Sequence, residues 1–282
     1  MQNFAIRAEQ LGVDDLWVTE NTVDPNFCFD PVVALTYAAA ATTRIRLGIA
    51  VALLPMHHPI HIAHQVASLD YISGGRAILG VGTGRDRHYE AFGIPSTRRI
   101  GRFAEGIEAL RRLWSDASAE FDGNFYQLHQ VSLSIHPVQP RLPIWLGSDH
   151  PNGVRRAAKL GDGWIGSGGG GGGLTVFKQN VQILKDSLDE AGRDVDSFPI
   201  SKRLFIAVGD SPKMARALLE PWFAVVYGDP ELVDTHGVYG TPEQVREQVE
   251  EVIAQGANHI VLNPVGDYIE QLEALAQIVA LS

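Results

Sequence analysis

Short apolar segments alternate along this chain with longer amphipathic segments. Several of the short segments are apolar at consecutive positions, which is typical of strands that are buried on both faces of a parallel sheet. The amphipathic segments between them have apolar residues at helical spacing. The pattern predicts seven strands, at residues 15–19, 46–51, 77–81, 144–147, 163–166, 202–208 and 259–263.

The helices are marked by clear start and stop signals. Thr241, Pro242 and Gln244 form a capping box with proline at the first helical position, and Gly256 follows where this helix should end. Repeated strand–helix units over one domain favour a (β/α)₈ TIM barrel over a doubly wound sheet. The glycines after residue 79 do not match a dinucleotide-binding fingerprint, which also disfavours the doubly wound fold.

The number of predicted strands is one short of a complete barrel. The chain begins with a helix at residues 1–11, where an eight-stranded barrel would have a strand first. Either this first strand has been lost, or the true start lies upstream, or another segment takes its place. Residues 115–143 are long for a connection and contain a turn between apolar residues, so we expect a β-hairpin insertion there. We predict a single domain over residues 1–282.

Composition and charge narrow the class of protein. The chain has 282 residues, of which 45% are hydrophobic, and a formal net charge of −10. This charge argues against nucleic-acid binding. Cys28 is the only cysteine, so no internal disulfide can form, and we read it as a thiol in a loop of a protein from the reducing cytoplasm. No apolar run reaches about 18 residues, so we expect no membrane partner.

Candidate chemistry lies where the predicted strands end, because barrel enzymes bind their ligands at that edge. Glu20 and Asn21 follow the first strand, and the second ends in apolar residues that suit a flat ring, Ala50 and Val51 among them. After the third strand, Gly84 is followed by a dense polar cluster at residues 85–88, which includes Arg85 and His88. A solvated charge run is the alternative reading of that cluster.

Two further strand ends have the composition of an anion site. Gly147 and Ser148 lead to Gly153 in the first turn of a helix, whose free N–H groups and positive dipole end would favour a phosphate. Ser167 begins the neighbouring loop, with six glycines from Gly168 to Gly173. A helix cap at Ser148 and a flexible linker at the glycines are the alternatives.

The histidines after the second strand do not predict a metal site. His57 and His58 precede Pro59 and suit a helix cap. His61 and His64 lie one turn apart on the next helix, but no carboxylate lies nearby in the sequence. We therefore expect no metal.

The motifs together resemble the bacterial luciferase-like family of flavin-dependent oxidoreductases, which includes enzymes that use coenzyme F420. The resemblance covers nearly the whole chain. It rests on residues 16–21, 43–51, 65–82, 137–140, 143–147, 157–164, 240–245 and 259–264.

The resemblance implies a (β/α)₈ barrel, a homodimer, and FMN or F420 at the strand ends. It implies a non-prolyl cis peptide at Ala50–Val51 behind the cofactor ring. It also implies cofactor contacts at Ala50 and Val51 and phosphate contacts at Ser148, Gly153, Ser167, Gly168 and Gly169. From their positions at strand ends, we expect further cofactor contacts at Glu20, Gly84, Arg85 and Gly147.

This chain also departs from the family pattern. Some F420 enzymes have an aspartate–histidine pair at Glu20-Asn21 and a lysine near Gly170. An asparagine cannot act as a general acid, and the missing lysine leaves FMN and F420 undistinguished.

We therefore expect a two-electron oxidoreductase or monooxygenase that acts on a small organic substrate, with Asn21 and His88 on the substrate side. In such an enzyme the cofactor carries the chemistry and the protein orients the reactants. Two alternatives stay open. A sugar-phosphate isomerase or aldolase would share the phosphate loops but needs a lysine or glutamate at a strand end, where only Glu20 is available. A protein that carries flavin or F420 without turnover is the other.

Overall fold

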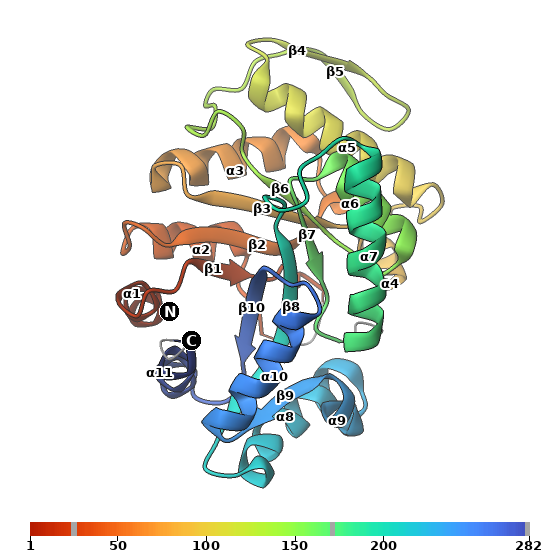
Figure 1. The fold of residues 1–282 in the computed structure, drawn as a ribbon. Helices are drawn as coiled ribbons and strands as arrows, with labels where there is room; N and C mark the ends of the chain where they lie inside the picture. The colour runs from red at the N-terminus through yellow and green to blue at the C-terminus, as the bar shows by residue number, and fades with distance from the viewer. Residues whose placement is uncertain (24–26, 170–172, 280–282) are drawn as a thin grey trace. The chain divides into compact units, whose positions relative to one another are not determined.

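A computed structural model describes residues 1–23, 27–169 and 173–279 (Figure 1). The chain divides into two compact units, which are described separately. One contains residues 2 and 14–145, and the other contains residues 1, 3–13 and the described part of 146–282. Strand β6 (Ile144–Gly147) contains the boundary between them.

The unit of residues 14–145 is built on parallel strands that adjoin in the order β1, β2, β3 and β6. Strand β2 is buried at almost every position, which explains its continuous apolar sequence. Its elements before β6 are β1 (Asp15–Val18), α2 (Pro31–Ala39), β2 (Arg46–Leu53), the 3₁₀ turn η1 (Leu54–Met56), α3 (Pro59–Ser73), β3 (Ala77–Gly82), α4 (Asp86–Phe92), α5 (Arg99–Ser115), β4 (Ala119–Asp122) and β5 (Gln127–Val131).

Strands β4 and β5 form the expected hairpin. They pair antiparallel, with Phe121 opposite Leu128, and they lie beside α5 (Figure 1). The Glu105 carboxylate of α5 accepts the N–H groups of Asn124 and Phe125 at 3.1 and 2.8 Å, which fixes the turn of the hairpin to the helix. The insertion is therefore an ordered part of this unit.

The other unit is also built on parallel strands, with β6 followed by β7, β8 and β10. Phe205 of β8 packs against Leu219 and Phe223 of helix α8, which forms the centre of one core cluster. The elements are α1 (Gln2–Gln10), α6 (Pro151–Leu160), β7 (Gly163–Gly166), α7 (Leu174–Glu190), β8 (Ile200–Val208), α8 (Pro212–Tyr227), η2 (Pro230–Leu232), α9 (Val233–His236), β9 (Gly237–Gly240), α10 (Pro242–Ala254), β10 (His259–Pro264) and α11 (Tyr268–Val279).

All seven predicted strands are present, and the sequence analysis missed one, β9. Phe205 and Ile206 of β8 each pair with both β9 and β10, so these two strands lie on opposite edges of β8. Strand β7 pairs with the first residues of β8, Ile200 to Lys202. Strand β9 has only four residues and is recognised by its pairing with β8.

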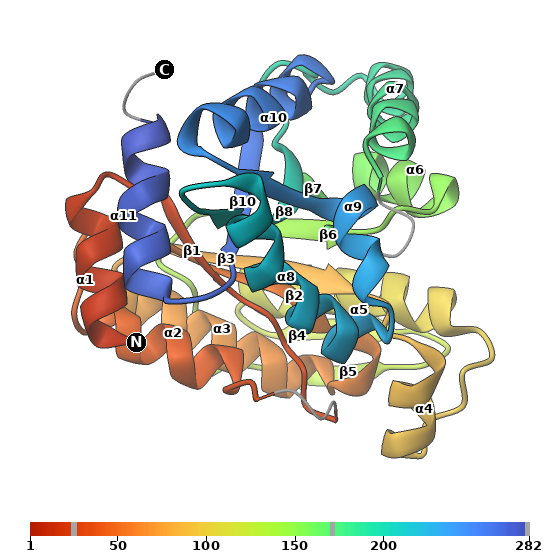
Figure 2. The same cartoon turned by 90° about the horizontal axis from the view of Figure 1, so that it is seen from below.

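Helix α1 begins the chain as expected, and among the described residues no strand precedes it. It lies beside α11 (Figure 2), and the Arg7 guanidinium donates to both Glu273 carboxylate oxygens at 2.5 and 2.8 Å. The rings of Phe4 and Tyr268 meet edge-on at 6.3 Å. Thr241 and Gln244 form the predicted capping box at the start of α10.

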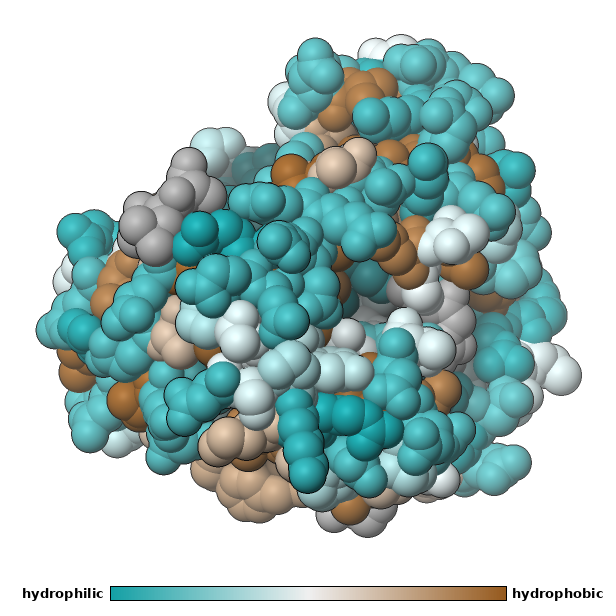
Figure 3. Space-filling model, turned by 60° about the horizontal axis from the view of Figure 1, so that its bottom comes forward, coloured by the Kyte–Doolittle hydropathy of each residue, from teal (hydrophilic) through white to brown (hydrophobic). Residues whose placement is uncertain are grey.

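The surface agrees with the charged composition. The face in Figure 3 is mainly hydrophilic, and its hydrophobic residues form small separate groups. Within the described ranges, no helix is both long enough and apolar enough to cross a membrane.

Candidate functional site

The peptide bond between Ala50 and Val51 is cis, which confirms the expectation at this point of β2. The Thr19 hydroxyl at the end of β1 donates to the Ala50 carbonyl at 3.0 Å. Gly82 of β3 makes room for Val51, since a Cβ atom at position 82 would lie 2.6 Å from the Val51 Cγ2 atom. The pairing of β2 with β3 shifts register between Ile49 and Ala52, so the strand bulges here.

Glu20 is the centre of a hydrogen-bonded group that we call the Glu20 cluster, with Thr22, Leu53 and His57. Its carboxylate accepts the Leu53 N–H at 2.6 Å and the Thr22 hydroxyl at 3.3 Å. The His57 Nε2 atom lies 2.9 and 3.0 Å from the two carboxylate oxygens. Glu20 is only 7% exposed. Its role in the Glu20 cluster is to hold the ends of β1 and β2 together.

The charge of Glu20 is stabilised inside this cluster. Burial alone would raise the pKa of its carboxyl group, but the hydrogen bond and charge of His57 and the Leu53 N–H outweigh it, so the pKa is lowered. Glu20 is therefore ionised at neutral pH. A carboxylate that holds one imidazole nitrogen orients the ring and stabilises its protonated form.

His57 is a site candidate that the sequence analysis missed. The expected cap role falls to His58 alone, whose Nδ1 accepts the Ile60 N–H at the start of α3. The His57 side chain is 30% exposed, and no described residue forms a hydrogen bond with its Nδ1 atom. The signal that could have found it is its position after β2, the strand next to the one that Glu20 follows.

Gly84, Arg85 and His88 lie after β3 as predicted, and they are tied together locally. The Arg85 N–H donates to the His88 Nδ1 atom at 3.0 Å, which closes the first turn of α4. Gly84 has a φ of +73°, and a Cβ there would lie 3.8 Å from a Leu53 methyl group. Gly84 therefore adjoins the Glu20 cluster at Leu53. Among the described residues, none forms a hydrogen bond with the Asn21 amide.

In the other unit, the first turn of α6 does not have the free N–H groups that we expected. The His150 side chain accepts the Asn152 N–H at 3.2 Å, and its carbonyl accepts the Gly153 N–H at 2.8 Å. The Ser148 hydroxyl oxygen accepts the His150 N–H at 3.2 Å. The prediction was wrong because His150 caps the helix with both its side chain and its main chain.

Ser167 binds a protein carboxylate. Its N–H donates to Asp149 Oδ1 at 2.9 Å, and its hydroxyl contacts Asp149 Oδ2. The Lys202 ammonium donates to the Ser167 carbonyl, and the Asn180 amide donates to the Asp149 carbonyl at 2.8 Å. We call Ser148, Asp149, Ser167 and Lys202 the Ser167 cluster. Its carboxylate and ammonium groups were not among the predicted site residues.

Lys202 is an unusual residue for its position. It is 4% exposed in β8, and burial lowers the pKa of its ammonium group to about 8, although the charge of Asp149 opposes this shift. Its ammonium also lies 5.5 Å from the centre of the Phe177 ring. A lysine at the start of a predicted buried strand is the sequence signal that could have marked it.

The predicted loop glycines are required by close packing. A Cβ at Gly168 would lie 2.8 Å from the Phe205 ring, one at Gly169 would lie 2.6 Å from the Tyr227 hydroxyl, and one at Gly153 would collide with Ser148 Oγ. Glycine therefore lets the backbone approach these side chains. Gly170 and the two glycines after it lie outside the described residues.

Arg156 of α6 is a second cation near these loops. Its Nη1 atom lies 3.9 Å from the position of a Cβ at Gly153. The side chain is half-buried, and this burial lowers the pKa of the guanidinium group. Within the described ranges no carboxylate pairs with it, so an anionic ligand can do so.

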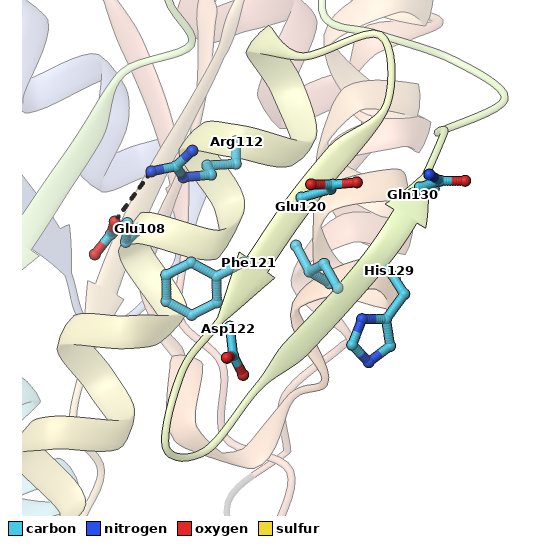
Figure 4. A pocket seen from close by; sticks show the side chains of 8 residues that line it. Glu108, Arg112, Glu120, Phe121, Asp122, His129 and Gln130 are labelled. Atoms are coloured by element: carbon cyan, nitrogen blue, oxygen red, sulfur yellow. Dashed lines mark ion pairs between the residues drawn. The ribbon is translucent and has the colours of Figure 1, made fainter.

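A groove of about 790 Å³ lies between α5 and the β4–β5 hairpin (Figure 4). Glu108 and Arg112 form an ion pair of 3.7 Å on its α5 side. The groove contains none of the predicted site residues and is not at the end of a parallel strand. It is lined by Glu108, Arg112, Glu120, Phe121, Asp122, Leu128, His129 and Gln130.

Comparison with known proteins identifies the family. The model of the luciferase-like monooxygenases matches residues 1–228. The chain belongs to this family. An F420-dependent glucose-6-phosphate dehydrogenase from Kineococcus radiotolerans is 30% identical over 226 residues, which are 76% of this chain and 66% of the relative. The chain spans about two thirds or less of the length of the first curated relatives that it matches.

Solved structures of luciferase-like enzymes have the same fold. A monooxygenase from Streptomyces bottropensis superposes with a TM-score of 0.86 at 23% identity, over 99% of this chain and 93% of the other. A type II Baeyer–Villiger monooxygenase from Pseudomonas putida, in complex with FMN, gives a TM-score of 0.79 at 19% identity, over 99% and 91%. The predicted α/β barrel fold of the luciferase-like type is therefore confirmed.

The donors and charges of these residues can be compared with what the phosphate of a luciferase-like cofactor would require. Arg156 offers a guanidinium, and the Ser148 hydroxyl proton has no acceptor among the described residues. Both groups suit an anion. Ser167, in contrast, already holds the Asp149 carboxylate with its N–H and hydroxyl groups. The residues thus fit an anionic group, and Asp149 contributes a negative charge next to it. The described residues contain no group of three or more metal-ligating side chains.

Proposed function

We propose that this chain is a two-electron oxidoreductase that uses FMN or coenzyme F420 on a small organic substrate. The observation that carries the proposal is the Glu20–His57 pair, which supplies an oriented proton-transfer group at the ends of β1 and β2. Membership of the luciferase-like family and the F420-dependent relative support the cofactor class. The bound cofactor would supply hydride transfer or oxygen activation.

The chemistry of the protein side follows from the pair. Glu20 is an ionised hydrogen-bond acceptor and holds Nε2 of His57 in its donor form. Nδ1 of His57 is then the basic nitrogen, which can take a proton from a substrate hydroxyl or return one to a substrate carbonyl. The Glu20 carboxylate stabilises the imidazolium that forms in between. This pair supplies the proton transfer that Asn21 cannot.

The other predicted residues keep more limited roles. We propose that Ala50, Val51 and Gly84 contact the cofactor ring and that Asn21 positions the substrate through its amide. His88 is 5% exposed and its Nδ1 already closes a turn of α4, so His57 replaces it as the proton-transfer histidine. Ser148 and Arg156 hold the anionic part of the cofactor. Arg85, Gly147, Gly153, Gly168 and Gly169 shape the backbone around these groups.

Reconstitution of the purified chain tests the proposal. We expect titration with FMN and with F420 to give saturable binding of at least one of them, and the loaded protein to oxidise or oxygenate members of an alcohol and ketone panel. Binding without turnover of any substrate would favour the carrier alternative, and the absence of binding would exclude the cofactor assignment.

We also propose that the chain is one cytoplasmic domain that forms a homodimer without nucleic-acid partners. The net charge of −10 and the single cysteine support the compartment and the absence of nucleic acid. Light scattering of the purified chain should give twice the 30.7 kDa monomer mass.

A further inference from the structure

We infer that Asp149 determines which phosphate the Ser167 cluster accepts, so that this chain prefers the singly charged phosphodiester of F420 to the doubly charged phosphomonoester of FMN. The inference rests on the proposed function and goes beyond it by distinguishing the two cofactors through one side chain.

The first argument is that an internal anion already occupies the best donors. The Ser167 N–H donates to Asp149 Oδ1 and its hydroxyl lies against Asp149 Oδ2, with the Gly169 carbonyl at 2.8 Å as a second acceptor of the hydroxyl. A phosphate at such a loop would be bound in the same way, with two donors of one serine at two of its oxygens. A ligand phosphate must therefore lie beside Asp149 or displace its carboxylate.

The second argument is that Asp149 is held firmly. The buried Asn180 amide fixes its carbonyl at 2.8 Å, and Asn180 is only 2% exposed. Lys202, which is also buried, donates to the carbonyl of the same serine and attracts the Asp149 charge. Displacing the carboxylate would leave the buried ammonium without this partner charge, which is costly.

The third argument is the balance of charge. Asp149 and Lys202 neutralise each other, and Arg156 in the middle of α6 leaves one positive charge. Arg155 is exposed and bonds to Asn152 at 3.1 Å, so solvent screens its contribution. One excess positive charge matches a phosphodiester, which carries one negative charge. The phosphomonoester of FMN is close to doubly charged at neutral pH and would leave one negative charge uncompensated beside Asp149.

The test compares the affinities for FMN, riboflavin and F420 by fluorescence titration at pH 7.5. Riboflavin has the same ring as FMN without the phosphate, so the ratio of the riboflavin and FMN dissociation constants isolates the effect of the phosphate. We expect Asp149→Asn to raise this ratio on the order of tenfold over the native chain. F420 affinity should change by less than about threefold, because the single charge of its phosphodiester is repelled less by Asp149 than the double charge of the FMN phosphate.

Two further variants make the result specific. Glu190→Gln removes one negative charge from the exposed end of α7 and should leave the ratio unchanged. Asp149→Ser removes the same charge with a smaller side chain and should repeat the effect if the asparagine variant does not fold.

The outcomes separate the inference from the proposed function. If the native chain binds F420 or riboflavin but the ratio does not change in either Asp149 variant, the inference alone is wrong. If FMN and riboflavin weaken together, Asp149 only supports the loop and the inference is also wrong. If the native chain binds none of the three ligands, the proposed cofactor class fails and the inference fails with it.

Discussion

Glu20 and His57 are 37 positions apart in the sequence, yet the imidazole Nε2 lies within 3.0 Å of both carboxylate oxygens of Glu20. The carboxylate is buried and the imidazole is partly exposed, so the charge lies inside and the basic nitrogen can meet a ligand. The same carboxylate accepts the Leu53 N–H, which ties the pair to the end of β2. A histidine oriented in this way is suited to acid–base catalysis.

His57→Asn should therefore reduce turnover while leaving cofactor affinity nearly unchanged. Loss of a positioned general acid–base group lowers the rate by about 10²–10⁴-fold. The measurement is kcat with a saturating cofactor, together with the cofactor Kd. His58→Asn is the matched control, because asparagine preserves the cap of α3 and His58 does not contact Glu20. Equal activity of the two variants would contradict the proposed role.

Arg156→Gln should weaken cofactor binding by about 10-fold or more, because a charge-assisted hydrogen bond contributes roughly 1.5–3 kcal/mol. The guanidinium is half-buried beside Gly153 and is not neutralised by a described carboxylate. Fluorescence titration measures the change. Arg155→Gln, on the exposed side of the same helix, should change affinity by less than about twofold. A similar loss in both variants would show that only net charge matters.

The lowered pKa of Lys202 predicts how the stability of the folded chain depends on pH. Its pKa is about 8 in the folded chain and about 10.4 in an unfolded chain. Between these values the unfolded state binds more protons, so this group makes the folded state more stable as the pH rises. The gain is at most about 3 kcal/mol. Below pH 8 both states are protonated and the contribution is constant.

Urea denaturation at pH 7.5 and pH 10 measures this effect as a difference between the native chain and Lys202→Met. The free energy of unfolding of the native chain should rise relative to that of the variant between the two pH values. Lys178→Met changes an exposed lysine of α7 and should follow the native chain. A constant difference between the native chain and Lys202→Met would show that the pKa of Lys202 is not lowered.

Gly168→Ala should destabilise the fold by about 1–3 kcal/mol, because the new methyl group would meet the Phe205 ring at 2.8 Å and the Arg203 carbonyl at 3.1 Å. Gly173→Ala is the matched control, since nothing lies within 4 Å of a Cβ there. Thermal unfolding of the two variants compares them directly. If both are as stable as the native chain, the loop accommodates a side chain at Gly168.

The sequence was sufficient for the parts of the fold that depend on local pattern. Short apolar segments marked the seven predicted strands, and proline with a capping residue marked the start of α10. The four residues of β9 were not predicted because the strand is defined by its pairing with β8. Strands of this kind are recognised from tertiary contacts alone.

The site was predicted at the level of strand ends and not at the level of side-chain partners. The position of Ala50–Val51 followed from the family resemblance. Glu20 and His57 lie on two loops that are far apart in the sequence, and their pairing depends on how the chain folds. The hydrogen bond from Ser167 to Asp149 depends on the direction of the Asp149 side chain. Sequence patterns do not specify such directions, so the Asp149 carboxylate beside the expected phosphate loop was not predicted.

Strand β8 has neighbours along both edges, with β10 on one and β7 and β9 in succession on the other. Its peptide groups are therefore shielded over most of their length, and every residue from Ile200 to Val208 except Arg203 is buried. Amide hydrogens in such a strand exchange with solvent only when the surrounding structure opens. In a hydrogen-exchange experiment the amides of β8 should be among the last in its unit to take up deuterium.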